Sequence, residues 1–234
     1  MRLESLGCIK RVNSRPHLVN PCSVVFSKKW RCVLDASLLL NPFCLKRKTC
    51  LADLSAIPLI LSEGDFMTVN DLDSGYWQVP IHPDHQKFLG LHFRHPDGSV
   101  DYWVWVVMPL GIIDAAHIFT SITDPLMSHL QLGGARSNIY IDDLLSLAST
   151  YEKGLAQDKF IQEFFLLGGW VFKPSKSSGV PSQRVKYLGL IINSLTMKFE
   201  IPQDKLIRLI EKAKYLLSLR RVLVKDIASW VGLL

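Results

Sequence analysis

Residues 137–148, SNIYIDDLLSLA, form an apolar, β-branched run interrupted by two adjacent carboxylates, Asp142 and Asp143. Without these acids the run predicts a buried strand. Removing even one unpaired carboxylate from water costs several kcal/mol, so two neighbouring acids require a compensating cation. Neighbouring side chains of a strand point to opposite faces, and both acids can therefore serve one site only beside a tight turn. The sequence predicts a β-hairpin with the acid pair at its tip.

A third acid lies in a similar setting. Residues 66–81 are rich in β-branched and aromatic side chains, which favours a strand leading into a turn, and Asp71 ends the apolar approach just before Ser74 and Gly75. One acid here and two in the hairpin are the set that a two-metal phosphoryl-transfer site needs, because Mg²⁺ prefers oxygen ligands. Each acid alone is more often a turn or capping residue. Their combination favours the functional interpretation.

These blocks, with others in the same order, resemble the reverse transcriptase domain of retroelements. Residues 140–143, YIDD, resemble that family's Tyr-x-Asp-Asp box, and residues 70–81 resemble its other catalytic-aspartate block. The remaining matches are residues 19–25 and 28–37 with the fingers segment, 108–119 with the Pro-Phe-Gly-Leu block, and 176–177 and 187–191 with the end of the palm and the primer grip. The set covers nearly the whole chain and is closest to DIRS-type and gypsy-type elements.

The chain departs from the family pattern at two places. Leu110 stands where an aromatic residue is usual, and Ala115-Ala116 replaces the usual Ala-Pro. In the family these positions line the nucleotide pocket and pack the palm helix, so the changes bear on substrate preference and catalytic rate. The catalytic carboxylates are intact.

The resemblance implies an α+β fold: the fingers and palm of a right-hand polymerase, with a split βαβ palm and a truncated thumb. Residues 1–65 would be fingers, 66–85 the palm segment with the first catalytic aspartate, 86–110 a hairpin between fingers and palm, and 111–200 the rest of the palm. Residues 201–234 would begin a thumb that is mostly absent, with no RNase H, integrase or recombinase domain after it. We therefore expect a fragment of a larger polyprotein, or a decayed or repurposed gene.

Hydrophobic periodicity predicts helices over residues 51–62, 114–130, 151–167 and 203–219, and another that begins at residue 224. Pro125 is expected to kink the second helix or to start a new one. A hairpin over residues 88–107 should turn at residues 95–98, HPDG. The expected apolar stripes are Ile118, Ile122, Leu126 and Leu130 on one helix and Leu155, Phe160, Ile161, Phe164 and Leu167 on the next.

The resemblance also implies roles for the acids. Asp71 and Asp142 would be the main ligands of two Mg²⁺ or Mn²⁺ ions, with Asp143 supporting them and the backbone carbonyl of Leu72 contributing. The reaction would be attack of a primer 3′-hydroxyl on the α-phosphate of a deoxynucleoside triphosphate.

Other positions would bind the substrates. Tyr76 would be the steric gate under the sugar, although a core tyrosine after a turn is the alternative. Arg31 would hold the triphosphate, since its planar fork matches phosphate oxygens, and the alternative is a solvated cation. The other expected contacts are Lys28, Lys29, Asp73 and Leu110 with the nucleotide, Tyr187, Leu188 and Gly189 with the primer terminus, and Lys176 and Lys186 with the template or primer backbone.

Composition agrees with a nucleic-acid partner. The net charge is +6, which suits an RNA or DNA template with its primer, although many ordinary domains are as basic. The chain has five cysteines, with no Cys-x-x-Cys pair, and we expect free thiols in a reducing compartment. The histidines at 82, 85, 92 and 95 could hold a metal, but solvated hairpin residues are the favoured interpretation. We expect an intracellular protein with no secretory signal and no membrane span.

The favoured function is RNA-directed DNA polymerase, acting on deoxynucleotides and attached to other domains of a parent polyprotein. A catalytically silent nucleic-acid-binding remnant and an inert structural remnant are the alternatives. The intact Asp71, Asp142 and Asp143 favour the enzyme, and the short thumb favours the others. Salt-sensitive duplex binding without nucleotide incorporation would identify the binding protein.

Overall fold

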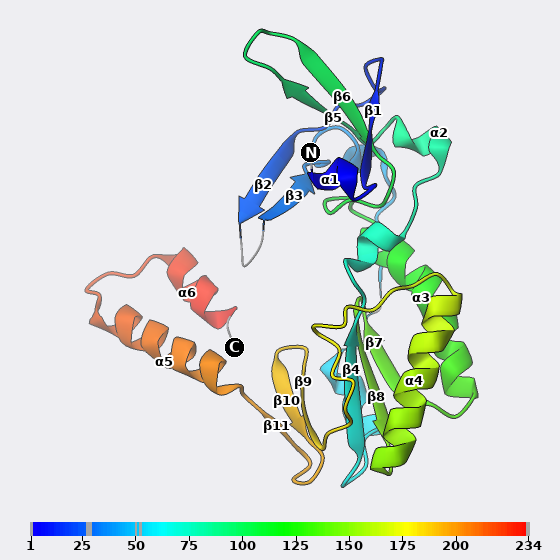
Figure 1. The fold of residues 1–234 in the computed structure, drawn as a ribbon. Coiled ribbons are helices and arrows are strands. Elements are labelled where there is room, and N and C mark those ends of the chain that lie inside the picture. Colours follow the sequence, from blue (N-terminus) through cyan, green and yellow to red (C-terminus); the bar gives the residue numbers. More distant parts are fainter. Residues whose placement is uncertain (1, 27–29, 50, 52, 233–234) are drawn as a thin grey trace.

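The computed structural model describes residues 2–26, 30–49, 51 and 53–232. Its elements form two groups, an N-terminal group at the top of Figure 1 and a larger group around a central sheet below it. The central sheet has the strand order β4-β8-β7, with β4 antiparallel to β8 and β8 antiparallel to β7. Its strands are β4 (Phe66–Asp71), β7 (Arg136–Tyr140) and β8 (Asp143–Ala148).

The central sheet is buried on both faces. Helices α3 (Ala115–Leu132) and α4 (Tyr151–Leu167) cover one face, and β9 (Arg184–Tyr187), β10 (Leu190–Asn193) and β11 (Lys198–Glu200) lie on the other (Figure 1). Because side chains alternate along a strand, Leu144 packs into the cluster on the helical side while Leu145 packs with Tyr187. Burial on both faces explains why β8 reads as a continuous apolar run. The split βαβ arrangement that we expected is confirmed by this strand order.

Helix α3 differs from its prediction in the face that it buries. The helix runs unbroken through Pro125, so no new helix starts there. Ile118 and Ile122, expected in the core, are exposed, and the buried face lies one position along the chain. Its members are Ala115, Phe119, Thr120, Thr123, Met127 and Leu130. A pattern of apolar residues does not predict this face, because two of its members are threonines. The Thr123 hydroxyl can be buried because it donates a hydrogen bond to the Phe119 carbonyl within the helix.

Helix α4 shows the same error. Leu155, Phe160 and Leu167 were expected in the core and are exposed. The buried positions are Gly154, Asp158, Ile161 and Phe165. Two of these residues, Gly154 and Asp158, carry no large apolar side chain. Gly154 lies where a Cβ would come within 3.0 Å of Pro181. Asp158 accepts a hydrogen bond from the Asn70 amide of β4, at 2.6 Å. Close packing at Gly154 and the polar contact of Asp158 therefore determine which face of α4 is buried, and that face differs from the predicted apolar one.

The N-terminal group contains two small sheets. One has the order β1-β6-β5, and the other is the β2–β3 hairpin. Its strands are β1 (Ile9–Val12), β2 (Cys22–Phe26), β3 (Trp30–Leu34), β5 (Gly90–Arg94) and β6 (Val100–Trp105). The predicted hairpin over residues 88–107 is confirmed as β5–β6, with Gly98 at positive φ in the turn. Two short helices complete the group, α1 (Arg2–Ser5) and α2 (Pro83–Gln86).

The helix predicted over residues 51–62 is wrong in type and extent. The structure has a 3₁₀ helix there, at Leu54–Leu59, with Pro58 inside it. Proline lacks a backbone N–H and disfavours α conformation in the residue before it, which prevents a longer α-helix. The Asp53 carboxylate caps the start by accepting the Ser55 N–H.

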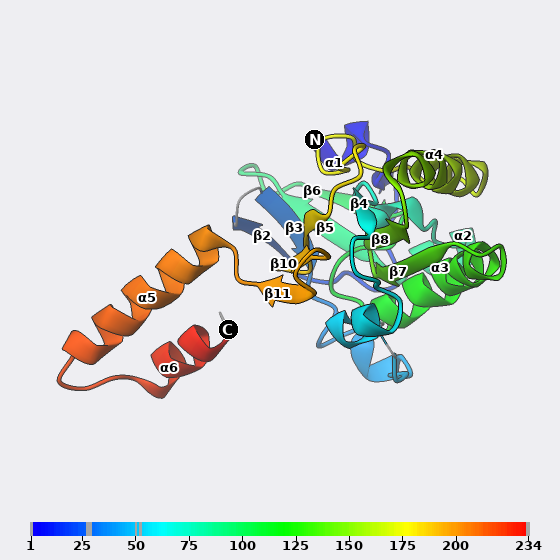
Figure 2. The same cartoon turned by 90° about the horizontal axis from the view of Figure 1, so that it is seen from below.

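The C-terminal residues form two helices, α5 (Gln203–Ser218) and α6 (Val224–Val231), close to the predicted bounds. Both project away from the central sheet, as Figures 1 and 2 show from two directions. They contact each other, and the Trp230 indole N–H donates to the Leu209 carbonyl. Among the helices that the structure describes, none is both long and apolar enough to cross a lipid bilayer.

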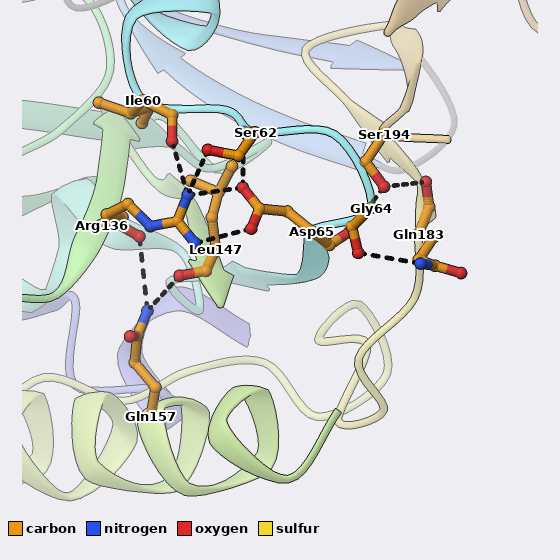
Figure 3. Close-up of polar contacts among 9 residues, drawn as sticks. All are labelled: Ile60, Ser62, Gly64, Asp65, Arg136, Leu147, Gln157, Gln183 and Ser194. Atoms are coloured by element: carbon orange, nitrogen blue, oxygen red, sulfur yellow. Dashed lines mark hydrogen bonds and ion pairs between the residues drawn. The ribbon is translucent and has the colours of Figure 1, made fainter. Parts of the chain in front are cut away.

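A partly buried ion pair, with a buried carboxylate, ties the lower end of the central sheet to the loop before β4 (Figure 3). The Arg136 guanidinium of β7 donates to both carboxylate oxygens of Asp65, at 2.6 and 2.7 Å. Asp65 is only 2% exposed, and its backbone carbonyl also accepts the Ser194 hydroxyl. The Ser62 N–H supplies a further donor to the carboxylate. The pair thus joins three segments that are distant in sequence.

Replacing Arg136 by Ala should destabilise the fold strongly, because Asp65 would keep a buried charge without its partner. We expect a loss of about 3–5 kcal/mol in the free energy of unfolding, measured by urea denaturation. Arg184→Ala is the matched control, since its guanidinium pairs with Glu200 at the surface, and it should cost less than about 1 kcal/mol. Equal losses in the two variants would contradict the importance of the buried pair.

Candidate active site

The acid pair lies at the tip of the β7–β8 hairpin, as predicted. Tyr140 and Asp143 are paired residues of the two strands, so Ile141 and Asp142 form a two-residue loop. Ile141 has φ 55°, and Asp142 does not have positive φ, which is the pattern of a type II′ turn. A β-branched residue rarely adopts positive φ, so this turn holds backbone strain. Strain of this kind persists where the surrounding structure fixes the backbone.

The third acid faces the hairpin directly. Asp71, at the end of β4, is the cross-strand partner of Asp143. Residues opposite each other on antiparallel strands have Cβ atoms about 4.5–5.5 Å apart and project from the same face. The Leu72 N–H also donates to the Asp142 carbonyl at 2.8 Å, which fixes the turn after β4 against the hairpin. The sheet therefore brings Asp71, Asp142 and Asp143 together.

The clustered negative charge affects Asp143. Burial, together with the charges of Asp142 and Asp71, raises the pKa of its carboxyl to about 6. Lys176 acts in the opposite direction: its ammonium donates a hydrogen bond to the Asp71 carboxylate. That bond, together with the nearby acids, raises the pKa of Lys176. The site is thus a negatively charged centre with one cation already beside it.

The stability of the protein should depend on the pH through Asp143. Its folded pKa is above the usual value, so the folded state binds the proton more tightly, and stability is lost as the pH rises from about 4 to about 6. Asp143→Asn removes this penalty. We expect the variant to gain about 1–3 kcal/mol over the wild type between pH 4 and pH 7, measured by urea unfolding across the range.

Asp97→Asn is the control with the opposite sign. Hydrogen bonds from Ser99 lower the pKa of Asp97, so removing that carboxylate should reduce stability above the usual titration range of an aspartate. If Asp143→Asn shows the same pH profile as the wild type, the electrostatic account of the carboxylate cluster is wrong.

A cavity of about 810 Å³ opens beside the acids. Five residues that we predicted for the active site line it, from four separate segments: Arg31, Asp73, Tyr76, Leu110 and Asp142. Lys28 and Lys29, the other predicted triphosphate ligands, lie outside the described residues. The cavity gives the predicted nucleotide-binding residues a common space next to Asp142.

Tyr76 lies between the cavity and the core. Its ring packs edge-on against Phe119 of α3, with 5.2 Å between centroids. Burial raises its pKa, with smaller contributions from Asp142 and Tyr140, so the phenol stays neutral. Gly75 permits this packing, because a Cβ there would come within 3.0 Å of the Phe119 ring and 3.3 Å of the Asp142 side chain.

The segment that carries Leu110 is fixed by backbone contacts. The Leu34 N–H of β3 donates to the Leu110 carbonyl, and the Asn41 side chain binds the backbone on both sides of Ile112. Gly111 has φ 115°, and a Cβ there would lie 1.9 Å from the Leu34 carbonyl oxygen. Only glycine fits at this crossing. Leu110 therefore occupies a rigid position at the wall of the cavity.

Lys173 is a cavity residue that sequence reasoning missed. It lines the same space as Arg31 and Asp142, and its N–H donates to the Asp71 carbonyl at 2.7 Å. Gln78 fixes the adjoining chain, since its side-chain amide bonds the carbonyls of Asp73 and Val171. Nothing in the sequence distinguishes Lys173 from the other lysines of the region, because its position depends on a loop that runs back along β4.

The predicted primer-grip residues lie in two environments. The Tyr187 side chain is 1% exposed, and its hydroxyl accepts from Asn138 and donates to the Asp143 carbonyl. Its hydroxyl contacts the β7–β8 hairpin from inside the fold. Of the three predicted residues, only those in the following turn could therefore contact a primer. Leu188 and Gly189 form that turn, both with positive φ, as in a type I′ hairpin. Their role at the primer stays a prediction.

The two lysines predicted to contact the nucleic-acid backbone are both engaged within the chain. The Lys176 ammonium contacts the Asp71 carboxylate. Lys186 of β9 lies 3.8 Å from the Asp204 carboxylate of α5, and both side chains are largely exposed. The Lys186 contact is weak enough to exchange for a phosphate.

The donor set suits hard cations, since it consists of carboxylate oxygens with mutually unfavourable charges. Within the described part of the chain, no three His, Cys, Asp or Glu side chains already converge on one point. The Lys176 ammonium occupies a position on Asp71 for which a cation would compete. The histidines at 82, 85, 92 and 95, for which a metal site was the less favoured interpretation, likewise show no such convergence within the described residues.

Sequence comparison identifies relatives of this chain. Residues 45–192 match the family model described as reverse transcriptase (RNA-dependent DNA polymerase). The Gag-Pol polyprotein of bovine immunodeficiency virus is 24% identical over 183 residues, which cover 76% of this chain and 12% of the polyprotein. The genome polyprotein of petunia vein clearing virus is 27% identical over 132 residues, which cover 56% of this chain and 6% of the polyprotein. The chain thus spans a small part of each relative.

Solved structures share the fold. A foamy viral protease-reverse transcriptase in complex with double-stranded DNA superposes with a TM-score of 0.78 at 21% identity, over 99% of this chain and 38% of that one. The same type of protein in complex with an RNA/DNA hybrid gives a TM-score of 0.77 at 19% identity, over 99% of this chain and 29% of that one.

Proposed function

Because this chain belongs to the reverse transcriptase (RNA-dependent DNA polymerase) family, we propose that it adds deoxynucleotides to a primer 3′-hydroxyl on an RNA template. The observation that supports this most strongly is the cross-strand pairing of Asp71 with Asp143 beside the turn that carries Asp142, which lines the same cavity as the predicted nucleotide-binding residues. The centre would be part of a retroelement or viral polyprotein, as its relatives are.

We propose that the carboxylates hold two divalent cations, as the family generally requires. Asp71 and Asp142 are the main ligands, Asp143 supports them, and the Leu72 carbonyl contributes an oxygen. When bound, Mg²⁺ or Mn²⁺ activates the attacking hydroxyl and neutralises charge on the phosphates. The Lys176 ammonium, which contacts Asp71, would be close enough to the site to meet a phosphate of the substrate or the template.

The cavity supplies the remaining functions. Arg31 and Lys173 provide cations for the triphosphate, since both line the space that Asp142 also faces. The Tyr76 ring closes the side on which the sugar would lie. Asp73 and Leu110 complete the walls, and Leu110 presents a smaller surface to the incoming base or sugar than an aromatic residue would.

Primer extension tests the proposal. A labelled DNA primer annealed to an RNA template is incubated with the chain, deoxynucleotides and Mg²⁺ or Mn²⁺. The same assay is run with the chain fused to the thumb of a related reverse transcriptase. Template-directed extension by either form supports the proposal.

The alternative is a nucleic-acid-binding remnant. No extension by either form, together with duplex binding that weakens steeply with salt, would replace the polymerase by that function. Ribonucleotide incorporation that ignores the template sequence would also contradict the proposal.

A further inference from the structure

The β2–β3 hairpin carries two cysteines whose side chains meet. Cys22 lies in β2 and Cys32 in β3, and their Sγ atoms are 2.7 Å apart. The strand register places Cys22 opposite Leu34 and Cys32 opposite Val24, so the two cysteines occupy a diagonal pair of positions. Diagonal positions are usually farther apart than direct partners. The close sulfur contact is therefore a specific property of this hairpin.

We propose that Cys22 and Cys32 are a redox-active pair that closes to a reversible disulfide and fixes the β2–β3 hairpin. A disulfide requires a sulfur–sulfur distance of about 2.05 Å, so closure needs the two side chains to approach by less than about 1 Å. The inference does not depend on the proposed polymerase activity.

Both thiols can be reached by a small oxidant. Cys22 is exposed, and Cys32 lines the candidate nucleotide cavity beside Arg31. By contrast, Cys8 is buried in the N-terminal core. The hydrogen bond between the two sulfurs lowers the pKa of Cys32, which favours its thiolate as the attacking group.

The oxidant is a small-molecule disulfide such as oxidised glutathione. The Cys32 thiolate attacks one sulfur of that disulfide, which forms a mixed disulfide and releases one thiol. Cys22, after losing its proton, then attacks the Cys32 sulfur and releases the second thiol. Overall, the two protein thiols give up two electrons and two protons, one external S–S bond breaks and one internal S–S bond forms. Excess reduced thiol reverses both steps.

The experiment follows the products of this exchange by mass spectrometry. The folded wild-type chain is incubated with oxidised glutathione, free thiols are alkylated, and peptides are mapped. We expect an internal 22–32 disulfide in the wild type and in Cys44→Ser, the matched control. Cys22→Ser and Cys32→Ser should instead stop at a glutathione adduct on the remaining cysteine of the pair. A wild type that keeps adducts on both residues, or that joins neither, would overturn the proposal.

Hydrogen exchange tests whether the bond fixes the hairpin. Amides of residues 22–26 and 30–34 should exchange about 10-fold more slowly in the oxidised wild type than in the reduced form, because opening of the hairpin becomes costlier. Cys22→Ser should show no such change under the same treatment. Equal exchange in oxidised and reduced wild type would exclude a stabilising role for the disulfide.

Discussion

Replacing Asp142 by Asn should reduce nucleotide incorporation by about 10³-fold or more, while the fold stays intact. The substitution keeps the size of the side chain and removes the negative charge that a divalent cation requires. Asp142 is also the one of the three acids that lines the cavity proposed for the nucleotide. The rate of single-nucleotide addition to a primer measures the effect.

The control separates chemistry from folding. Asp84→Asn replaces a carboxylate that is 81% exposed on the short helix α2, and it should incorporate nucleotides at the wild-type rate. Circular dichroism and urea unfolding should show that Asp142→Asn is folded and at least as stable as the wild type, because one of three clustered charges is gone. Full activity of Asp142→Asn would refute the assignment of this residue as a metal ligand.

Replacing Tyr76 by Ala should relax the choice between deoxyribonucleotides and ribonucleotides. The ring fills the side of the cavity next to Asp142 and is held by edge-on contact with Phe119. Its loss opens space where a 2′-hydroxyl would otherwise clash. We expect discrimination, measured as the ratio of kcat/KM for the two nucleotide classes, to fall on the order of 10–100-fold.

Tyr76→Phe tests whether the ring itself is responsible. This variant keeps the aromatic surface against Phe119 and removes only the hydroxyl, so its discrimination should remain close to that of the wild type. If Tyr76→Ala retains full discrimination, the steric gate lies elsewhere and the alternative that we considered, a core tyrosine, is correct.

The positions of the acids were easier to predict from the sequence than the packing of the helices around them. Two acids in an apolar run predicted a hairpin tip, and the pairing of Tyr140 with Asp143 confirms it. A third acid at the end of a strand was expected to join them, and Asp71 is the cross-strand partner of Asp143. Their joint role as metal ligands stays a prediction. These inferences needed only the alternation of a strand and the cost of burying charge. They did not need knowledge of distant contacts.

The remaining features depended on tertiary structure. The buried faces of α3 and α4 include Thr123, Gly154 and Asp158. Gly154 packs closely against Pro181, and Asp158 accepts a hydrogen bond from Asn70 of β4. Lys173 reaches the cavity because its loop is bonded to the chain around Asp71. The contact of Lys176 with Asp71 has the same origin. Such contacts between distant segments cannot be predicted from the local sequence.

Cation binding at the carboxylates tests the central claim most directly, because it does not depend on how the primer is held. Electron paramagnetic resonance measures free Mn²⁺ in titrations of the chain with a deoxynucleoside triphosphate, and a titration of the nucleotide alone provides the baseline. We predict two Mn²⁺ per wild-type chain above that baseline, and weaker binding with fewer ions for Asp142→Asn. Equal binding by the wild type and by Asp142→Asn would contradict the two-metal centre.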